Sequence, residues 1–201
     1  MKKILFLFLA ACFFFSCEKE TIVIPQQHAG RTVLAFFWAD NSLNSSLRNN
    51  IQTMMQGLQA MKDSAALLVY WDGEASDISW PEPCIVEYVT NGQGGINSLS
   101  KGTIDAMMAD KNTSIYDLIG IGNIRKKYPP QTSTEKTVMQ TVIGDMMSAY
   151  PSESYGIIFG SHGSGWLPTI TGTRSIGQDG GRYSSDTALI PELAEVLRTV
   201  N

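Results

Sequence analysis

The segment "FGSHGSGW" contains His162, one of only two histidines in the 201-residue chain. An imidazole titrates near neutral pH, so it can take the proton of a nucleophilic thiol. The flanking glycines leave room for a substrate backbone, and the N–H of Gly163 can stabilise a developing oxyanion. Turns at strand ends also contain histidines for purely structural reasons, so the residue types alone leave both interpretations open.

Spacing argues against other kinds of site around this histidine. The glycines lack the lysine of a P-loop, and "WLPTITGTRS" after Gly165 is not helical, as a dinucleotide fingerprint requires. A nucleophile elbow needs a glycine two residues before the serine. That position holds Phe159 for Ser161 and His162 for Ser164, so neither serine fits the pattern. One usable histidine with scattered aspartates predicts no metal site.

Alternating strands and helices must position His162. Apolar runs predict buried strands at 31–40, 65–73 and 154–160, and partial alternation predicts a further strand at 82–90. Amphipathic periodicity predicts helices at 41–63, about 103–110, 133–151 and 190–201. Segment 114–129 has weak periodicity and is left unassigned. This order predicts an α/β sandwich with a mainly parallel sheet, whose functional residues lie beyond the carboxyl ends of the strands.

Two of these helices have polar residues suited to cap their first turns. Asn41 or Ser42 is expected to cap the first long helix, and Ser133 or Thr134 is expected to cap the helix before the last predicted strand. The first strand, helix and second strand are long enough for a right-handed parallel crossover.

The amino-terminal residues predict export. Residues 1–16 have basic, apolar and small-residue regions in the order of a signal peptide. The junction before Cys17 resembles a bacterial lipobox, except for bulky phenylalanines in place of a Leu-Ala-like pair. We expect a lipid on Cys17, a polar tether over 17–30, and a membrane-anchored lipoprotein at the periplasmic face or cell surface. A net charge of −4 argues against a nucleic-acid partner.

The segment "YGIIFGSHGSGWLP" resembles the catalytic-histidine motif, H-G-x-G-W, of the clostripain family of cysteine peptidases. Other segments resemble the family in the same order, namely "RTVLAFFWADNSL", "ALLVYWDG", "TVMQTVIGDMMSAYPSESYGIIF", "SIGQDG" and "IPELAEVL". The resemblance covers about residues 31–201. It implies a caspase-like α/β/α sandwich and endopeptidase cleavage after arginine or lysine by a His–Cys dyad.

The resemblance assigns roles to three residues, and the position of Asp40 at the end of a strand suggests a role for a fourth. His162 becomes the general base, and Gly163 supplies the oxyanion N–H. Trp166 shapes the pocket wall or, equally well, anchors the core under the loop. Asp40, at the end of the first strand, lines the substrate pocket or acts as a turn or cap residue.

Family members are often cut between the histidine and the cysteine. No cofactor is expected from the residues, although the resemblance allows calcium, which some family members need. Arg174 and Arg182 are then candidate processing sites, or solvated charges in an ordinary loop. Asp179 matches a family position, but its role does not follow from the residues. A protein or peptide substrate is expected.

The chain departs from the family at the nucleophile. The family cysteine follows the next strand in an Asp-Ala-Cys-type motif, and no such strand occurs before Asn201. Cys84 lies inside an apolar strand and is expected to be buried and inert. We therefore expect 31–201 to be a partial peptidase domain, incomplete at its carboxyl end and inactive alone, whose cysteine comes from sequence beyond it or from a second chain.

A truncation, a split gene and a true short protein remain alternatives at this stage. The competing functional interpretations are a non-catalytic surface-binding lipoprotein and a degenerate peptidase remnant.

Overall fold

The computed structural model describes residues 30–73, 82–110, 112–163, 175–179 and 186–200. Its strands are β1 Arg31–Trp38, β2 Ala65–Asp72, β3 Cys84–Val89, β4 Asn123–Lys127, β5 Tyr155–Gly160, β6 Ser175–Asp179 and β7 Asp186–Leu189. Its helices are α1 Asn44–Ala60, α2 Lys101–Ala109, α3 Ile115–Ile121, α4 Lys136–Ala149 and α5 Ile190–Thr199. The predicted strands and helices are therefore confirmed. Segment 114–129, left unassigned from the sequence, forms α3 and β4.

The central sheet has five strands in the order β4-β3-β2-β1-β5. β1 runs parallel to β2 and to β5, as the long helical crossovers require. β3 is antiparallel to both of its neighbours, so four of the five strands point the same way. The mainly parallel α/β architecture is confirmed, with β3 as the reversed strand.

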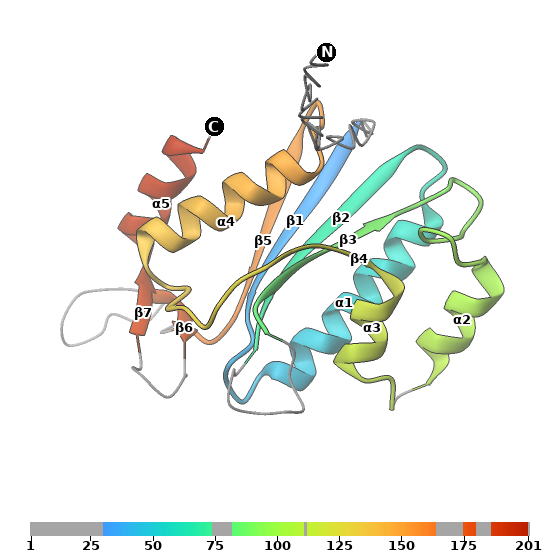
Figure 1. The fold of residues 1–201 in the computed structure, drawn as a ribbon, viewed down its shortest axis with the longest axis horizontal. Coiled ribbons are helices and arrows are strands. Elements are labelled where there is room, and N and C mark those ends of the chain that lie inside the picture. Colours follow the sequence, from blue (N-terminus) through green and yellow to red (C-terminus); the bar gives the residue numbers. More distant parts are fainter. Residues whose placement is uncertain (1–29, 74–81, 111, 164–174, 180–185, 201) are drawn as a thin grey trace, which may run out of the picture.

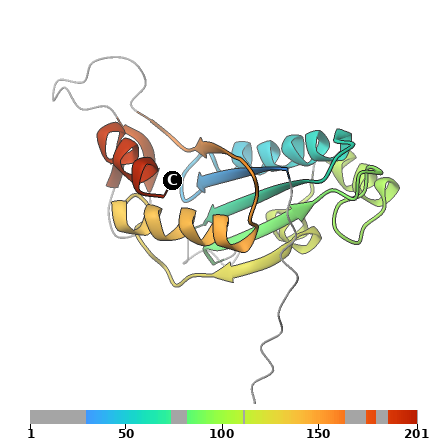
Figure 2. The same cartoon turned by 90° about the horizontal axis from the view of Figure 1, so that it is seen from above.

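Helices cover both faces of the sheet. Figures 1 and 2 show α1 on one face and α4 on the other. Alternate side chains of β1 point to opposite faces of the sheet. Phe37 packs in the core cluster that contains residues of α1, α2 and α3, and Phe36 packs in the cluster that contains residues of α4 and α5. Because β1 and β2 are buried on both faces, their sequences are continuous apolar runs.

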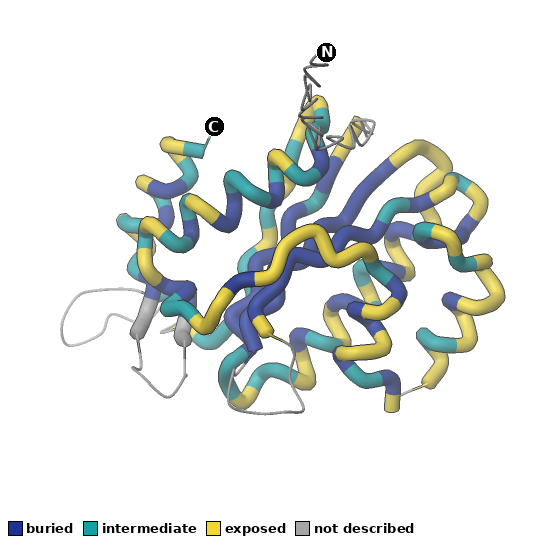
Figure 3. Tube along the Cα trace, in the orientation of Figure 1, coloured by how far each residue is buried: buried dark blue, intermediate teal, exposed yellow. Residues whose placement is uncertain are grey.

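The two edge strands differ sharply in chemistry. β4 is exposed along its whole length and carries Arg125, Lys126 and Lys127 (Figure 3). Charges of this kind prevent an edge strand from pairing with another chain. β5, at the opposite edge, has the sequence "YGIIFG" and carries no charge or proline. Within the described residues, β5 therefore presents an unprotected sheet edge.

The prediction that β5 is a buried strand is wrong. Its residues are half-buried or exposed, and Ile158 is 44% exposed. Ile158 pairs with Ala35, whose side lies toward the α1 cluster. Among the described residues, that side of β5 is exposed at Gly156 and Ile158 and is packed against the α1 cluster only at Gly160, so the apolar run does not report complete burial here.

Both predicted helix caps are also wrong. α1 begins after Leu43 and α4 after Glu135, and neither residue makes a side-chain cap hydrogen bond. Asn41 instead accepts a hydrogen bond from the Leu43 N–H within the preceding turn. The Ser133 hydroxyl bonds the buried Tyr70 hydroxyl at 2.7 Å, and this tertiary contact replaces a local cap.

Candidate active site

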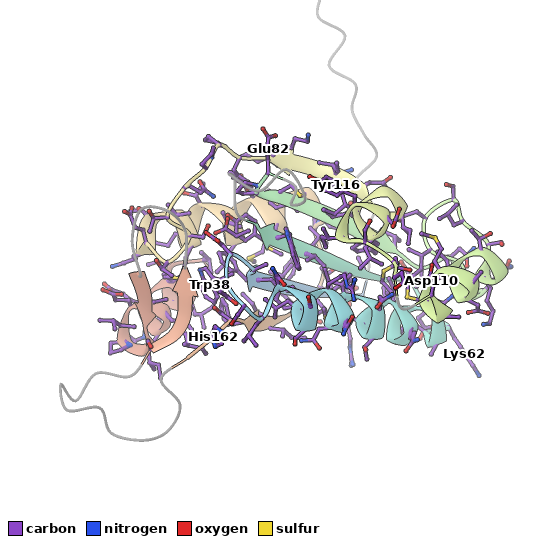
Figure 4. The ribbon with its side chains drawn as sticks, turned by 90° about the horizontal axis from the view of Figure 1, so that it is seen from below. Trp38, Lys62, Glu82, Asp110, Tyr116 and His162 are labelled. Atoms are coloured by element: carbon purple, nitrogen blue, oxygen red, sulfur yellow. The ribbon has the colours of Figure 1, made fainter. Side chains whose placement is uncertain are left out.

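The site lies where β1 and β5 end side by side. Phe37 pairs with Gly160 in the parallel ladder, so the turns that follow both strands leave the sheet at the same edge. This is the edge where parallel α/β sheets bind ligands. Figure 4 shows His162 close to Trp38 near the beginning of α1, whereas Lys62 lies beyond the far end of that helix.

Two polar contacts join these turns across 120 residues of sequence. Ser42 Oγ lies 2.9 Å from His162 Nε2. Asn41 Nδ2 donates to Ser161 Oγ at 3.3 Å and to the Trp38 carbonyl at 2.7 Å. The turn after β1 therefore contacts both polar residues that follow β5. His162 itself is half-buried, which leaves part of the imidazole accessible.

Gly160 lets α1 approach the end of β5. A Cβ at this position would lie 2.6 Å from Phe37 Cδ1 and 2.7 Å from Leu47 Cδ2. Both side chains are almost fully buried, so neither has room to move. The absence of a side chain at Gly160 thus allows the first turn of α1, and the loop before it, to lie against the histidine turn.

The β6–β7 hairpin, which the sequence analysis did not predict, lies against the ends of β1 and β5. A Cβ on Gly177 of β6 would lie 3.1 Å from the ring of Trp38. A Cβ on Gly163 would lie 3.1 Å from the Ser175 carbonyl oxygen. Gly163 is exposed at the surface beside His162, so the backbone next to the imidazole is accessible.

Of the predicted site residues, the structure brings three together at this edge. His162 and Gly163 follow β5, and Asp40, which is half-buried, follows the adjacent strand β1. The predicted residues Trp166, Arg174, Arg182 and Cys17 lie outside the described residues. Their roles remain predictions.

The contribution of Ser42 and Asn41 to the site was not predicted from the sequence. Both residues were considered only as helix caps. The available signal was their position directly after a strand that was expected to be parallel and central. What the sequence did not reveal is that β1 and β5 are neighbours, and only this pairing brings Ser42 to His162.

Cys84 is unsuited to act as the nucleophile beside His162. It is the first residue of β3 rather than a mid-strand residue, and it is 2% exposed. Cys84, Trp71, Phe37 and Gly160 lie in register across four neighbouring strands. Three strand spacings place Cys84 about 14 Å from Gly160, far beyond hydrogen-bond reach of the histidine turn.

The protonation of Cys84 leads to the same conclusion. Burial raises the pKa of its thiol to about 11, and a nearby lysine opposes this only in part. The reactive thiolate is therefore scarce at neutral pH. The sequence prediction of a buried cysteine is confirmed.

The described residues contain no group of three or more histidine, cysteine, aspartate or glutamate side chains placed to hold a metal ion. Within the same part of the chain, the helices are too short or too polar to cross a membrane.

Comparison with known proteins gives one family match. The family model of the clostripain family, Peptidase_C11, matches residues 35–201. No curated protein matches the chain. The chain is similar to several solved structures of cysteine proteases from Bacteroides.

An X-ray structure of a secreted C11 cysteine protease from Bacteroides thetaiotaomicron, in complex with an irreversible peptide inhibitor, is 25% identical with a TM-score of 0.57. The match covers 86% of this chain and 39% of that chain. A structure of the secreted C11 protease "iotapain" from the same species is 15% identical with a TM-score of 0.53, covering 87% of this chain and 43% of that chain. A B. fragilis cysteine protease is 26% identical with a TM-score of 0.48, covering 70% of this chain and 95% of that chain. The chain thus spans well under half of either B. thetaiotaomicron protease chain.

Proposed function

The chain belongs to the clostripain family, and from this premise we propose that it carries the histidine part of a His–Cys endopeptidase site that cleaves after arginine or lysine. The observation that carries the proposal is the position of His162. It lies two residues beyond β5, half-buried, at the edge where β1 and β5 end together. A family match over residues 35–201 includes this turn and the carboxyl ends of the strands that form the edge.

The chemistry assigned to His162 is proton transfer. His162 takes the proton of a cysteine thiol as the sulfur attacks the scissile carbonyl, which forms a tetrahedral oxyanion. The N–H of Gly163 donates to that oxyanion. When the C–N bond breaks, His162 gives its proton to the leaving amine and an acyl-enzyme thioester remains. Water then attacks the thioester, His162 removes a proton from that water, and the thiol leaves with a proton from His162.

The nucleophile in this proposal is a cysteine outside the 201 residues, on the same polypeptide or on a second chain. The sequence has three cysteines, and two of them, Cys12 and Cys17, lie in or next to the predicted signal peptide. Cys84 is buried on a different strand, with its thiol pKa raised.

The uncharged edge of β5 supports a strand as the carrier of that cysteine. A parallel strand paired with β5 would end at the same edge of the sheet as His162. β4, at the other edge of the sheet, carries the charges that discourage such pairing.

The remaining assignments complete this proposal. Asp40 and Trp166 contact the substrate. Arg174 and Arg182 are sites at which the active peptidase cuts the chain between the histidine and the cysteine. A calcium requirement is tested by adding a chelator to the active protein.

Export and anchoring also belong to the proposal. Residues 1–16 act as a signal peptide, Cys17 is lipidated, and 17–30 tether the peptidase domain of 31–201 to a membrane surface. The similar B. thetaiotaomicron C11 proteases are described as secreted, which supports export of this chain.

The test isolates the protein from cells that express it from its own gene, so that any polypeptide supplying the cysteine is retained. Hydrolysis of peptide reporters ending in arginine, lysine or glutamate is then measured. Wild-type protein should cleave the arginyl and lysyl reporters, and iodoacetamide should abolish cleavage. The 201-residue chain produced alone should cleave none of them.

Activity of the chain alone would refute the assignment of an external cysteine. Absence of all reporter cleavage by the native protein would refute the peptidase proposal and favour a surface-binding role instead.

A further inference from the structure

The turn after β1 places the hydroxyl of Ser42 within hydrogen-bond distance of the His162 imidazole. We infer that Ser42 is a positioning residue for that histidine. The inference rests on the proposed role of His162 as a general base. Ser42 Oγ lies 2.9 Å from His162 Nε2. Among the described residues, Ser42 is the hydrogen-bond partner of this ring. A base needs a fixed ring orientation and tautomer, and such a contact supplies both.

Asn41 holds the turn that presents Ser42. Its Oδ1 accepts from the Leu43 N–H at 2.9 Å, which closes the backbone around Ser42. Its Nδ2 donates to the Trp38 carbonyl at the end of β1. The turn is therefore tied to the sheet, and α1 begins directly after Leu43. Ser42 is consequently held between two regular elements rather than on a free loop.

The role of His162 decides the direction of the hydrogen bond. A serine hydroxyl either donates or accepts, so the contact alone permits both tautomers. With the proton on Nε2, that N–H donates to Ser42 Oγ, and Nδ1 keeps the lone pair that accepts a thiol proton. After that transfer both ring nitrogens carry protons, and Ser42 still accepts from Nε2. One arrangement of Ser42 thus serves the neutral and the protonated ring without rearrangement.

The opposite direction fails this requirement. If the Ser42 hydroxyl donated to Nε2, the free nitrogen would already carry a proton and would not act as the base. The proposed role of His162 therefore requires Nε2–H in the resting imidazole, with Nδ1 on the side that faces the nucleophile.

Ser42 is exposed, so water partly replaces its hydroxyl when it is removed. We expect Ser42→Ala to lower kcat about five- to tenfold and to leave KM unchanged. This is the size expected for the loss of one ordinary hydrogen bond. Threonine retains the hydroxyl and should restore most of the rate.

The first test is nuclear magnetic resonance on the full chain, with 15N in the histidine rings. Because the chain has only two histidines, His28→Gln assigns the signals of His162. At pH 9, wild-type His162 should show one Nε2-protonated tautomer with a slowly exchanging Nε2 proton. Ser42→Ala should speed that exchange at least about tenfold and mix the tautomers, because the acceptor is lost.

Two controls make this reading specific. Ser42→Thr should keep the wild-type signals. Ser45→Ala removes an exposed hydroxyl in the first turn of α1, which among the described residues bonds its neighbour Asn44, and it should also leave the His162 signals unchanged. Identical His162 signals in wild type and Ser42→Ala would overturn the inference.

The second test is kinetic and uses the native peptidase. A fall in kcat for Ser42→Ala that is reversed in Ser42→Thr supports the positioning role, and an unchanged kcat overturns it. Failure of the proposed function is seen separately, since a native protein without peptidase activity would refute that function while the ring signals still decide whether Ser42 orients His162.

Discussion

Gly160 should not tolerate even one added carbon, because it lies where α1 meets the end of β5. The added Cβ of Gly160→Ala would lie 2.6 and 2.7 Å from two ring atoms of Phe37 and 2.7 Å from Leu47 Cδ2. Those side chains are 1% and 3% exposed, so the clash must be relieved by shifting the core. Overpacking of this kind typically costs about 1–3 kcal/mol in the free energy of unfolding.

The matched control lies on the same strand. Gly156 and Gly160 lie on the same face of β5, but a Cβ on Gly156 meets nothing within 4 Å. Alanine restricts the unfolded chain, so Gly156→Ala should be neutral or stabilising by up to about 1 kcal/mol. Urea unfolding followed by circular dichroism measures the free energy of unfolding of both variants. In thermal unfolding followed by the same signal, the melting temperature of Gly160→Ala should fall by about 2–12 °C.

Equal stabilities of the two variants would refute the packing account of this edge. Destabilisation by Gly156→Ala alone would refute it as well, because it would place the close approach at the wrong end of β5.

Three further predictions concern parts of the fold that lie away from the site. Between pH 9 and 11 the unfolded chain loses a thiol proton that buried Cys84 keeps, since burial raises its pKa to about 11. Rising pH should therefore lower the free energy of unfolding by about 2 kcal/mol more in wild type than in Cys84→Ala, as measured by urea titrations across that range. Ser114 caps α3 in a reciprocal capping box, so Ser114→Ala should cost about 1 kcal/mol by the same titration, and a loss below 0.3 kcal/mol would contradict the cap. Arg125 pairs with the 4% exposed carboxylate of Glu87, whereas Lys127 pairs only at the surface. Arg125→Met should thus destabilise the protein by about 2 kcal/mol or more, because it leaves the buried Glu87 carboxylate without this partner, and Lys127→Met should destabilise it by less than about 1 kcal/mol. Equal losses would argue against this role of Arg125.

The order of elements was predictable because it depends on local patterns. Buried parallel strands such as β1 and β2 must be apolar on both faces, and α1 and α4 repeat apolar residues at helical spacing. The same patterns place His162 directly beyond a strand end. The prediction that the histidine lies at a functional edge of the sheet depended on these patterns alone.

Features that depend on distant partners were not predictable. Ser133 looked like a helix cap because its partner, Tyr70, lies 63 residues away. β5 looked buried because composition does not report which strand lies at an edge. The contact between Ser42 and His162 needs the β1–β5 pairing, which joins segments 120 residues apart.

The β6–β7 hairpin was missed for a local reason. Its strands are only five and four residues long, and "SIGQD" is too polar and glycine-containing to show a strand pattern.

The central claim is that His162 activates a cysteine that is not Cys84. The most direct measurement treats the native protein with an irreversible acyloxymethyl ketone peptide ending in arginine and locates the adduct by mass spectrometry. The account predicts an adduct on a cysteine outside the 201 residues, with a labelling rate that falls at least about 100-fold in His162→Ala and is unchanged in His28→Ala. An adduct on Cys84, or equal labelling of wild type and His162→Ala, would contradict it.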